Sequence, residues 1–130
     1  MQFNAYGHAG IEGTHKNVFE LTQKTGVIPK GDAVVGTRAD FQPDAVSALA
    51  QVSKKIIMTL KVRSYSETIT GECNTSYSPS SDIIVRKGPQ RSPSTLIVNA
   101  DKSAADLPKQ MIEALKNPEE RMIVTIDRLA

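Results

Sequence analysis

The sequence predicts an α+β protein that is rich in β-strands and contains two short helices. Short segments that alternate apolar and polar residues cover most of the chain. Two segments with helical spacing each carry a proline near the start, and the pair Ala-Asp precedes both, as Ala39-Asp40 and Ala100-Asp101. These observations indicate an internal duplication of a strand-strand-strand-helix-strand unit. We expect a single domain over residues 1–130, with halves of about 1–64 and 65–130.

An open sheet of the predicted strands would expose the unpaired backbone groups of its two edge strands. Because closure removes such edges, we expect a closed or nearly closed barrel-like sheet. An open two-layer sheet with both helices on one face is the alternative.

Composition and charge narrow the class of protein. Of the 130 residues, 39% are hydrophobic and 23% are charged, which is typical of a folded globular chain. The net charge of +2 is too small to indicate a nucleic-acid or membrane partner by itself. Cys73 is the single cysteine and has no partner for an internal disulfide, and neither a membrane-spanning run nor a signal peptide is apparent. We therefore expect a cytosolic protein that does not enter a membrane.

The first half contains five predicted elements. Gly10 and Gly13 permit a turn between the first two strands, so we expect a hairpin, which we call the Gly7–Lys16 hairpin. Asp40 is placed to cap the helix. The apolar face of that helix is formed by Ala45, Ala48, Leu49 and Val52. The elements are strands over 1–7, 14–22 and 33–39, a loop over 26–32, a helix from Pro43, and a strand over 55–62.

The second half repeats this order. The stretch 55–73 is either one long bent strand or a hairpin that turns near Arg63-Ser64. Asp101 repeats the position of Asp40 before the second helix, and we expect the two halves to superimpose. The elements are strands over 67–73, 83–87, 95–100 and 122–126, and a helix whose apolar face is Leu107, Met111, Ala114 and Leu115.

Several short motifs occur in a fixed order along the chain. They are Gly7-His8, Thr14-His15-Lys16, Glu20-Leu21-Thr22, Gly31-Asp32, Ala39-Asp40, Asp82–Lys87 and Asn99–Ala104. Together they resemble the archaeal domain-of-unknown-function family 371 over nearly the whole chain. The resemblance implies a small archaeal cytosolic protein with an internal repeat, and it implies no activity. Ala9 stands where family members typically carry proline, and Gly71-Glu72 stands where their second half carries Gly-His, which argues against two equivalent histidine sites.

The Gly7–Lys16 hairpin contains both histidines, His8 and His15. At the base of a hairpin two imidazoles would stand close together, within reach of a metal or a substrate. The alternative is that both rings bond to backbone groups and are structural. No tight metal-binding spacing is present. The candidate ligand-binding residues are His8, His15, Lys16, Glu20 and Asp32.

A basic loop follows the second-half strand over 83–87 and contains no acidic residue. Its candidate anion-binding residues are Arg86, Lys87 and Arg91. Basic side chains position phosphates without reading sequence, and a solvated loop is the alternative. Tyr77 is the only aromatic residue nearby, which argues against nucleic-acid stacking.

No catalytic constellation is complete, so the sequence favours a ligand-binding or regulatory module with a site near the Gly7–Lys16 hairpin. Its partner would be a small-molecule or anionic ligand, and a homo-oligomer is compatible with the sequence. One alternative is a small enzyme that uses His8 and His15, with or without a metal. The other is a nucleic-acid-associated protein that uses the loop from Arg86 to Arg91.

Overall fold

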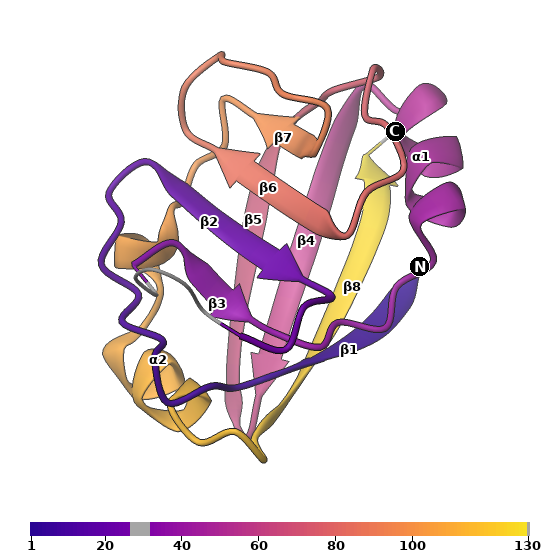
Figure 1. Ribbon diagram of the computed structural model, residues 1–130. Helices are drawn as coiled ribbons and strands as arrows, with labels where there is room; N and C mark the ends of the chain where they lie inside the picture. Colours follow the sequence, from indigo (N-terminus) through magenta and orange to yellow (C-terminus); the bar gives the residue numbers. More distant parts are fainter. Residues whose placement is uncertain (27–31, 130) are drawn as a thin grey trace.

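The computed structural model describes residues 1–26 and 32–129, and these contain eight β-strands, two α-helices and one 3-10 helix (Figure 1). The predicted α+β class and the predicted order of strands and helices are present. Most of the predicted loop over residues 26–32 lies outside the described residues. In chain order the elements are β1 (Gln2–Tyr6), β2 (Val18–Thr22), β3 (Val34–Gly36), α1 (Pro43–Gln51), β4 (Lys55–Val62), β5 (Tyr65–Cys73), β6 (Asp82–Arg86), β7 (Thr95–Val98), η1 (Ala104–Asp106), α2 (Lys109–Leu115) and β8 (Arg121–Leu129).

The described strands form one eight-stranded mixed sheet in the order β1-β8-β4-β5-β7-β6-β2-β3. β1 and β3 are its outermost strands, so the predicted closed barrel was wrong. Within the described chain, the backbone of β1 meets the segment after β3 in one isolated bridge, between Tyr6 and Thr37. A ladder cannot extend from this bridge, because β3 is only three residues long and Arg38 then adopts a left-handed backbone with φ of 48°.

The predicted hairpin between residues 1–7 and 14–22 was also wrong. β1 pairs with β8, and β2 pairs with β6 and β3, so the two strands are not neighbours in the sheet. The stretch 55–73, in contrast, is a hairpin, because β4 and β5 pair antiparallel along their length. Arg63 at its turn has φ of 55°, the left-handed conformation that tight hairpin turns require.

Apolar alternation along the strands fills the interior of the curled sheet. α1 and α2 lie at opposite ends of this curl, and the loop after β1 passes over α2 (Figure 1). Burial of apolar side chains from both halves in one cluster is the main stabilising contribution. The fully buried strand residues include Ile56, Met58, Leu60 and Val62 of β4, and Met122, Val124 and Ile126 of β8.

The two helices differ in how well their buried faces were predicted. For the second helical segment the prediction is confirmed, since Leu107, Met111, Ala114 and Leu115 are all buried. For α1 it was wrong: Ala45 and Ala48 are exposed, Leu49 is half-buried, and Val52 is 58% exposed.

The buried residues of α1 are Val46, Ser47 and Ala50. The Ser47 hydroxyl donates to the Tyr77 carbonyl (3.1 Å), so a polar residue faces the core and hides the true periodicity. Among the described helices, none has both the length and the apolar character needed to span a bilayer.

Asp40 and Asp101 do not cap the helices, contrary to the prediction, because neither lies at a helix N-cap. Each instead bonds to the backbone of the first strand of its own half. The Asp40 carboxylate accepts the Asn4 N–H (2.7 Å), and the Asp101 carboxylate accepts the Thr70 N–H (3.0 Å). The two aspartates therefore occupy matching environments. The duplication itself stays a prediction, which a superposition of the halves tests.

Candidate functional site

The segment between β1 and β2 runs along η1 and α2 instead of folding as a hairpin. Near its start, the His8 N–H donates to the Leu115 carbonyl at the C-terminal end of α2 (2.8 Å). Near its end, the His15 carbonyl accepts the Ala105 N–H in η1 (3.0 Å). A helix of seven residues is about 10 Å long, so the two histidines lie at opposite ends of this helical segment. The structure therefore does not bring the two imidazoles to one site.

His15 is fixed at the entrance to β2 by its own ring. Its Nδ1 atom accepts hydrogen bonds from the backbone N–H groups of Asn17 and Val18, both at 3.1 Å. A ring nitrogen that accepts does not carry the proton, so in the neutral imidazole the proton is on Nε2. The Nε2–H group is then a donor available to a ligand.

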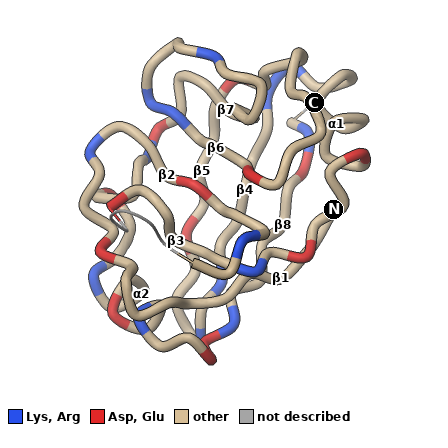
Figure 2. Tube along the Cα trace, in the orientation of Figure 1, with Lys and Arg blue, Asp and Glu red and all other residues tan. Residues whose placement is uncertain are grey.

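The register of β2 and β6 brings the histidine segment and the basic loop together, because Val18 lies opposite Arg86 in this antiparallel pair. A hollow of about 540 Å³ opens at this place, and we call it the His15–Arg86 hollow. Figure 2 shows that the connection after β6 carries basic positions and no acidic one. The residues lining the hollow are His15, Asn17, Val18, Arg86, Gly88 and Gln90.

Arg86 is held in a defined orientation by a buried hydroxyl. Its Nε atom donates to Thr95 Oγ1 (3.1 Å), and Thr95 is fully buried in β7. The same oxygen accepts the Ser92 N–H (3.1 Å), which fixes the loop beside it. With Nε engaged, the two Nη groups form the fork that binds a carboxylate or a phosphate through two parallel hydrogen bonds.

Glu20 lies on the same outer face of β2 and contributes charge near Arg86. Burial raises the pKa of this carboxyl group, and the nearby carboxylate of Asp82 raises it further. The charges of Lys24 and Arg86 lower the same pKa and so oppose the shift. Glu20 is therefore an electrostatic neighbour of the hollow rather than one of its walls.

The other predicted residues are distributed more widely. His8 Nδ1 accepts the Gly10 N–H (2.9 Å) at the far end of α2, and Lys16 and Arg91 are exposed. Asp32 approaches the site only through its backbone, where its carbonyl accepts the His15 N–H (2.9 Å). Lys87 points to η1 and forms an ion pair with Asp106 (2.8 Å). Of the eight predicted residues, His15 and Arg86 line the hollow.

Sequence reasoning missed four residues of the hollow: Asn17, Val18, Gly88 and Gln90. Asn17 and Gln90 carry amide side chains close to predicted residues, and this proximity was the available signal. Nothing local indicated that their two segments meet.

The described chain offers little support for metal or thiol chemistry. Within residues 1–26 and 32–129, no group of three His, Cys, Asp or Glu side chains is arranged to hold a metal ion. Cys73 is buried, and burial raises the pKa of its thiol to about 11. A thiol in this state is a poor nucleophile at neutral pH.

Comparison with known families and proteins decides which family the chain belongs to. Residues 3–129 match the family described as "Domain of unknown function (DUF371)". The chain belongs to this family. It is also 32% identical over 123 residues to "Uncharacterized protein MJ0206" of Methanocaldococcus jannaschii, a match that covers 89% of this chain and 90% of the relative. The resemblance drawn from the sequence motifs is thus confirmed. Neither the family description nor the name of this relative states an activity, so the function is argued from the site.

Proposed function

We propose that this DUF371 protein is a small ligand-binding module whose His15–Arg86 hollow takes a molecule that bears a phosphate or carboxylate group. The observation that carries the proposal is that His15 and Arg86 both line one hollow. These groups come from different halves of the chain and are each oriented by other hydrogen bonds. Pre-oriented donors bind an anion at a lower cost in side-chain entropy.

The chemistry of the walls favours an anion over a cation. The Arg86 Nη groups offer a planar fork, and the His15 Nε2–H group offers one further donor. Asn17 and Gln90 add amide groups that adapt to the rest of a ligand. The volume of about 540 Å³ falls within the range of small-molecule pockets.

Two alternatives receive less support from the geometry. An enzyme that uses both histidines needs His8 and His15 at one place, and they lie at opposite ends of η1–α2. A nucleic-acid interface on the basic loop needs several unpaired cations, and Lys87 is paired with Asp106 at 2.8 Å.

Binding of inorganic phosphate and of citrate, followed by two-dimensional amide NMR at an ionic strength of about 0.15 M, tests the proposal. We expect the largest shifts at Asn17, Val18 and Gly88. Hydrogen bonds to charged groups contribute about 1.5–3 kcal/mol, so Arg86→Gln should weaken binding by about 10-fold to 100-fold.

The matched control is Arg91→Gln, which removes the same charge from an exposed position in the same loop. It should leave binding within about twofold, because a solvent-exposed charge outside the hollow is largely screened. Equal losses in the two variants would contradict a formed site. Preferred binding of a single-stranded oligonucleotide, with steep salt dependence and loss on Arg91→Gln, would favour the nucleic-acid alternative.

A further inference from the structure

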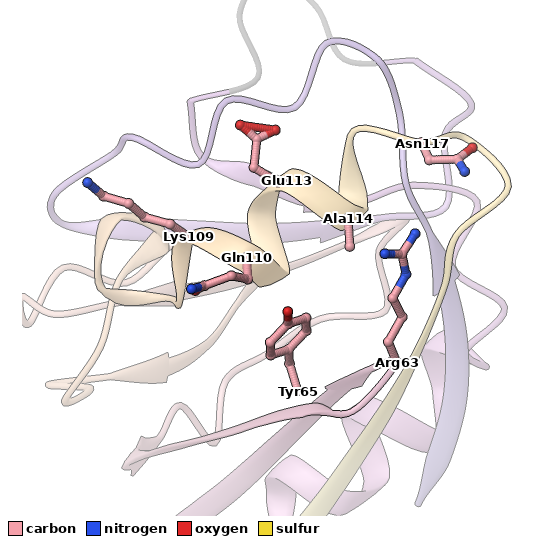
Figure 3. A pocket seen from close by; sticks show the side chains of 7 residues that line it. All are labelled: Arg63, Tyr65, Lys109, Gln110, Glu113, Ala114 and Asn117. Carbon is pink, nitrogen blue, oxygen red and sulfur yellow. The ribbon is translucent and has the colours of Figure 1, made fainter.

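A second hollow lies between α2 and the β4–β5 turn, away from the His15–Arg86 hollow. It has a volume of about 440 Å³ and is lined by α2 on one side and by Arg63 and Tyr65 on the other. Figure 3 shows both side chains rising side by side from the turn toward α2, with the small side chain of Ala114 above the gap between them. The small residue on the helix is what leaves this space open.

Arg63 is held in place by its backbone conformation in the turn and by Glu120, the residue before β8. Its backbone is left-handed, with φ of 55°, and its Nε atom donates to the Glu120 carboxylate at 2.6 Å. Glu120 therefore engages the Nε edge of the guanidinium. In Figure 3 the other end of the group lies beneath the C-terminal part of α2, next to Ala114 and Asn117. The Nη groups are positioned for two parallel hydrogen bonds to a carboxylate.

Tyr65 supplies a flat aromatic wall beside this guanidinium. The residue is partly buried and packs against the hydrophobic core, so its ring is anchored. Its hydroxyl group points toward α2, and the Gln110 amide hangs from the helix on the same side (Figure 3). A planar ring placed against Tyr65 would keep its polar substituents within reach of these groups, in the stacked or edge-on arrangements that aromatic pairs prefer.

Glu120 balances the charge of Arg63, and Lys116 balances that of Glu113, so Lys109 leaves a net positive charge at the hollow that favours an anionic ligand. Glu113 pairs with Lys116 at 3.5 Å and points to the opposite side of the helix from Tyr65 in Figure 3. Lys109 lies at the rim and adds a positive charge. We propose that this hollow binds a flat aromatic carboxylate, with the ring against Tyr65 and the carboxylate on Arg63. This site is independent of the proposed anion site at Arg86.

The probe is 4-fluorobenzoate, observed by fluorine NMR with the whole protein. We expect binding in the millimolar range, competition by unlabelled benzoate, and clearly weaker competition by cyclohexanecarboxylate, which has the charge without the flat ring. The uncharged 4-fluorobenzamide should also bind clearly more weakly. Because hydrogen bonds to charged groups contribute strongly, Arg63→Gln should weaken binding of the probe by about tenfold or more.

Arg121→Gln is the matched control, since it removes the same charge from an exposed site outside the hollow. Gln110→Glu is a second variant on the exposed face of α2, which should repel the carboxylate without loosening the turn; urea unfolding confirms that each variant is folded. The proposal is overturned by absence of binding at millimolar probe. It is also overturned by equal binding of cyclohexanecarboxylate, or by unchanged binding in both Arg63→Gln and Gln110→Glu. Phosphate binding at Arg86 should persist in all three variants, which separates this site from the other.

Discussion

Gly7→Ala should destabilise the fold strongly, because the added methyl group would meet backbone atoms of another element. It lies at the end of β1 where the chain turns onto α2. A Cβ atom built at Gly7 would come within 3.0 Å of the carbonyl oxygens of both Leu115 and Asn117, which real Cβ atoms essentially never do. Both are backbone atoms at the end of a packed helix, so neither can rotate away. Gly7→Ala therefore has to separate β1 from α2.

The size of the effect follows from the contacts that this separation disturbs. The Gly7 N–H donates to the Glu120 carbonyl (2.9 Å), and the His8 N–H donates to the Leu115 carbonyl (2.8 Å). Overpacking costs about 1–3 kcal/mol, and weakening two hydrogen bonds adds about 1 kcal/mol each. The lower entropy of the unfolded alanine chain offsets about 0.4–1 kcal/mol. We expect a net loss of about 3 kcal/mol in the free energy of unfolding.

Urea unfolding at pH 7, followed by circular dichroism, measures this loss. Gly88→Ala is the control, because the added Cβ atom there would meet only the far end of the Gln90 side chain, which can move. The control should change stability by less than about 0.5 kcal/mol. If Gly7→Ala lowered the free energy of unfolding by less than about 1 kcal/mol, or if both variants lowered it equally, α2 would be able to shift at little cost and the packing argument would be wrong.

Three further outcomes are expected. Leu115→Ala should lower the free energy of unfolding in urea by about 2–5 kcal/mol because Leu115 is fully buried. Leu49 is only partly buried, so Leu49→Ala should lower it by less than half as much. Equal losses would contradict the assigned helix faces. The hydrogen bond from Lys87 and those from Ser103 lower the pKa of Asp106 to about 2, so its carboxylate stabilises the fold above pH 3.8, and this contribution is lost as the pH falls toward 2. At pH 7, Asp106→Asn should lower the free energy of unfolding by less than about 1 kcal/mol, since the carboxylate is partly exposed. The difference in unfolding free energy between the variant and the unmodified protein should shrink between pH 4 and pH 2 in urea titrations. A difference that stays constant over this range would contradict the assigned role of Asp106. Cys73 should react with iodoacetamide at pH 8 far more slowly in the native state than in urea, because burial raises its thiol pKa to about 11, and equal rates would argue against this.

Local patterns in the sequence predicted the elements well where one face of a strand is buried and the other is not. The alternation in β4 and β8 is of this kind, and the predicted residues are buried. The same patterns say nothing about which strand pairs with which. β1 and β2 are separated by a glycine-containing segment that would suit a hairpin, yet the antiparallel partner of each, β8 and β6 respectively, comes from the far half of the chain. Strand pairing depends on tertiary packing, which a local pattern does not contain.

The candidate site shows the same limit more sharply. His15 and Arg86 were each recognised from their own segments, as members of two separate candidate sites. Only the antiparallel register that sets Val18 opposite Arg86 joins them. A shift of that register by one residue would turn Arg86 into the interior, so the site depends on a feature that no single segment encodes. Asp40 was misjudged for a related reason, since its partner Asn4 lies on a strand 36 residues earlier in the chain.

The bridge between Tyr6 and Thr37 also has a consequence for how the molecule opens. In the described chain, β1 is joined to the segment after β3 by the two backbone hydrogen bonds of this bridge (2.8 and 2.7 Å), by the contacts of Asp40, and by side-chain bonds from Thr37 and Arg38, whereas β4 and β8 are joined by a long ladder. Local opening, which needs less free energy than global unfolding, occurs where the fewest hydrogen bonds have to break. We therefore expect water to reach Ala5 and Gly36 first at this seam; the two residues lie so close that a Cβ atom added at Gly36 would be 3.0 Å from that of Ala5. We expect the least protected amides of the sheet interior to lie on either side of the seam, and we expect β4 and β8 to exchange their amide protons only when the whole molecule unfolds.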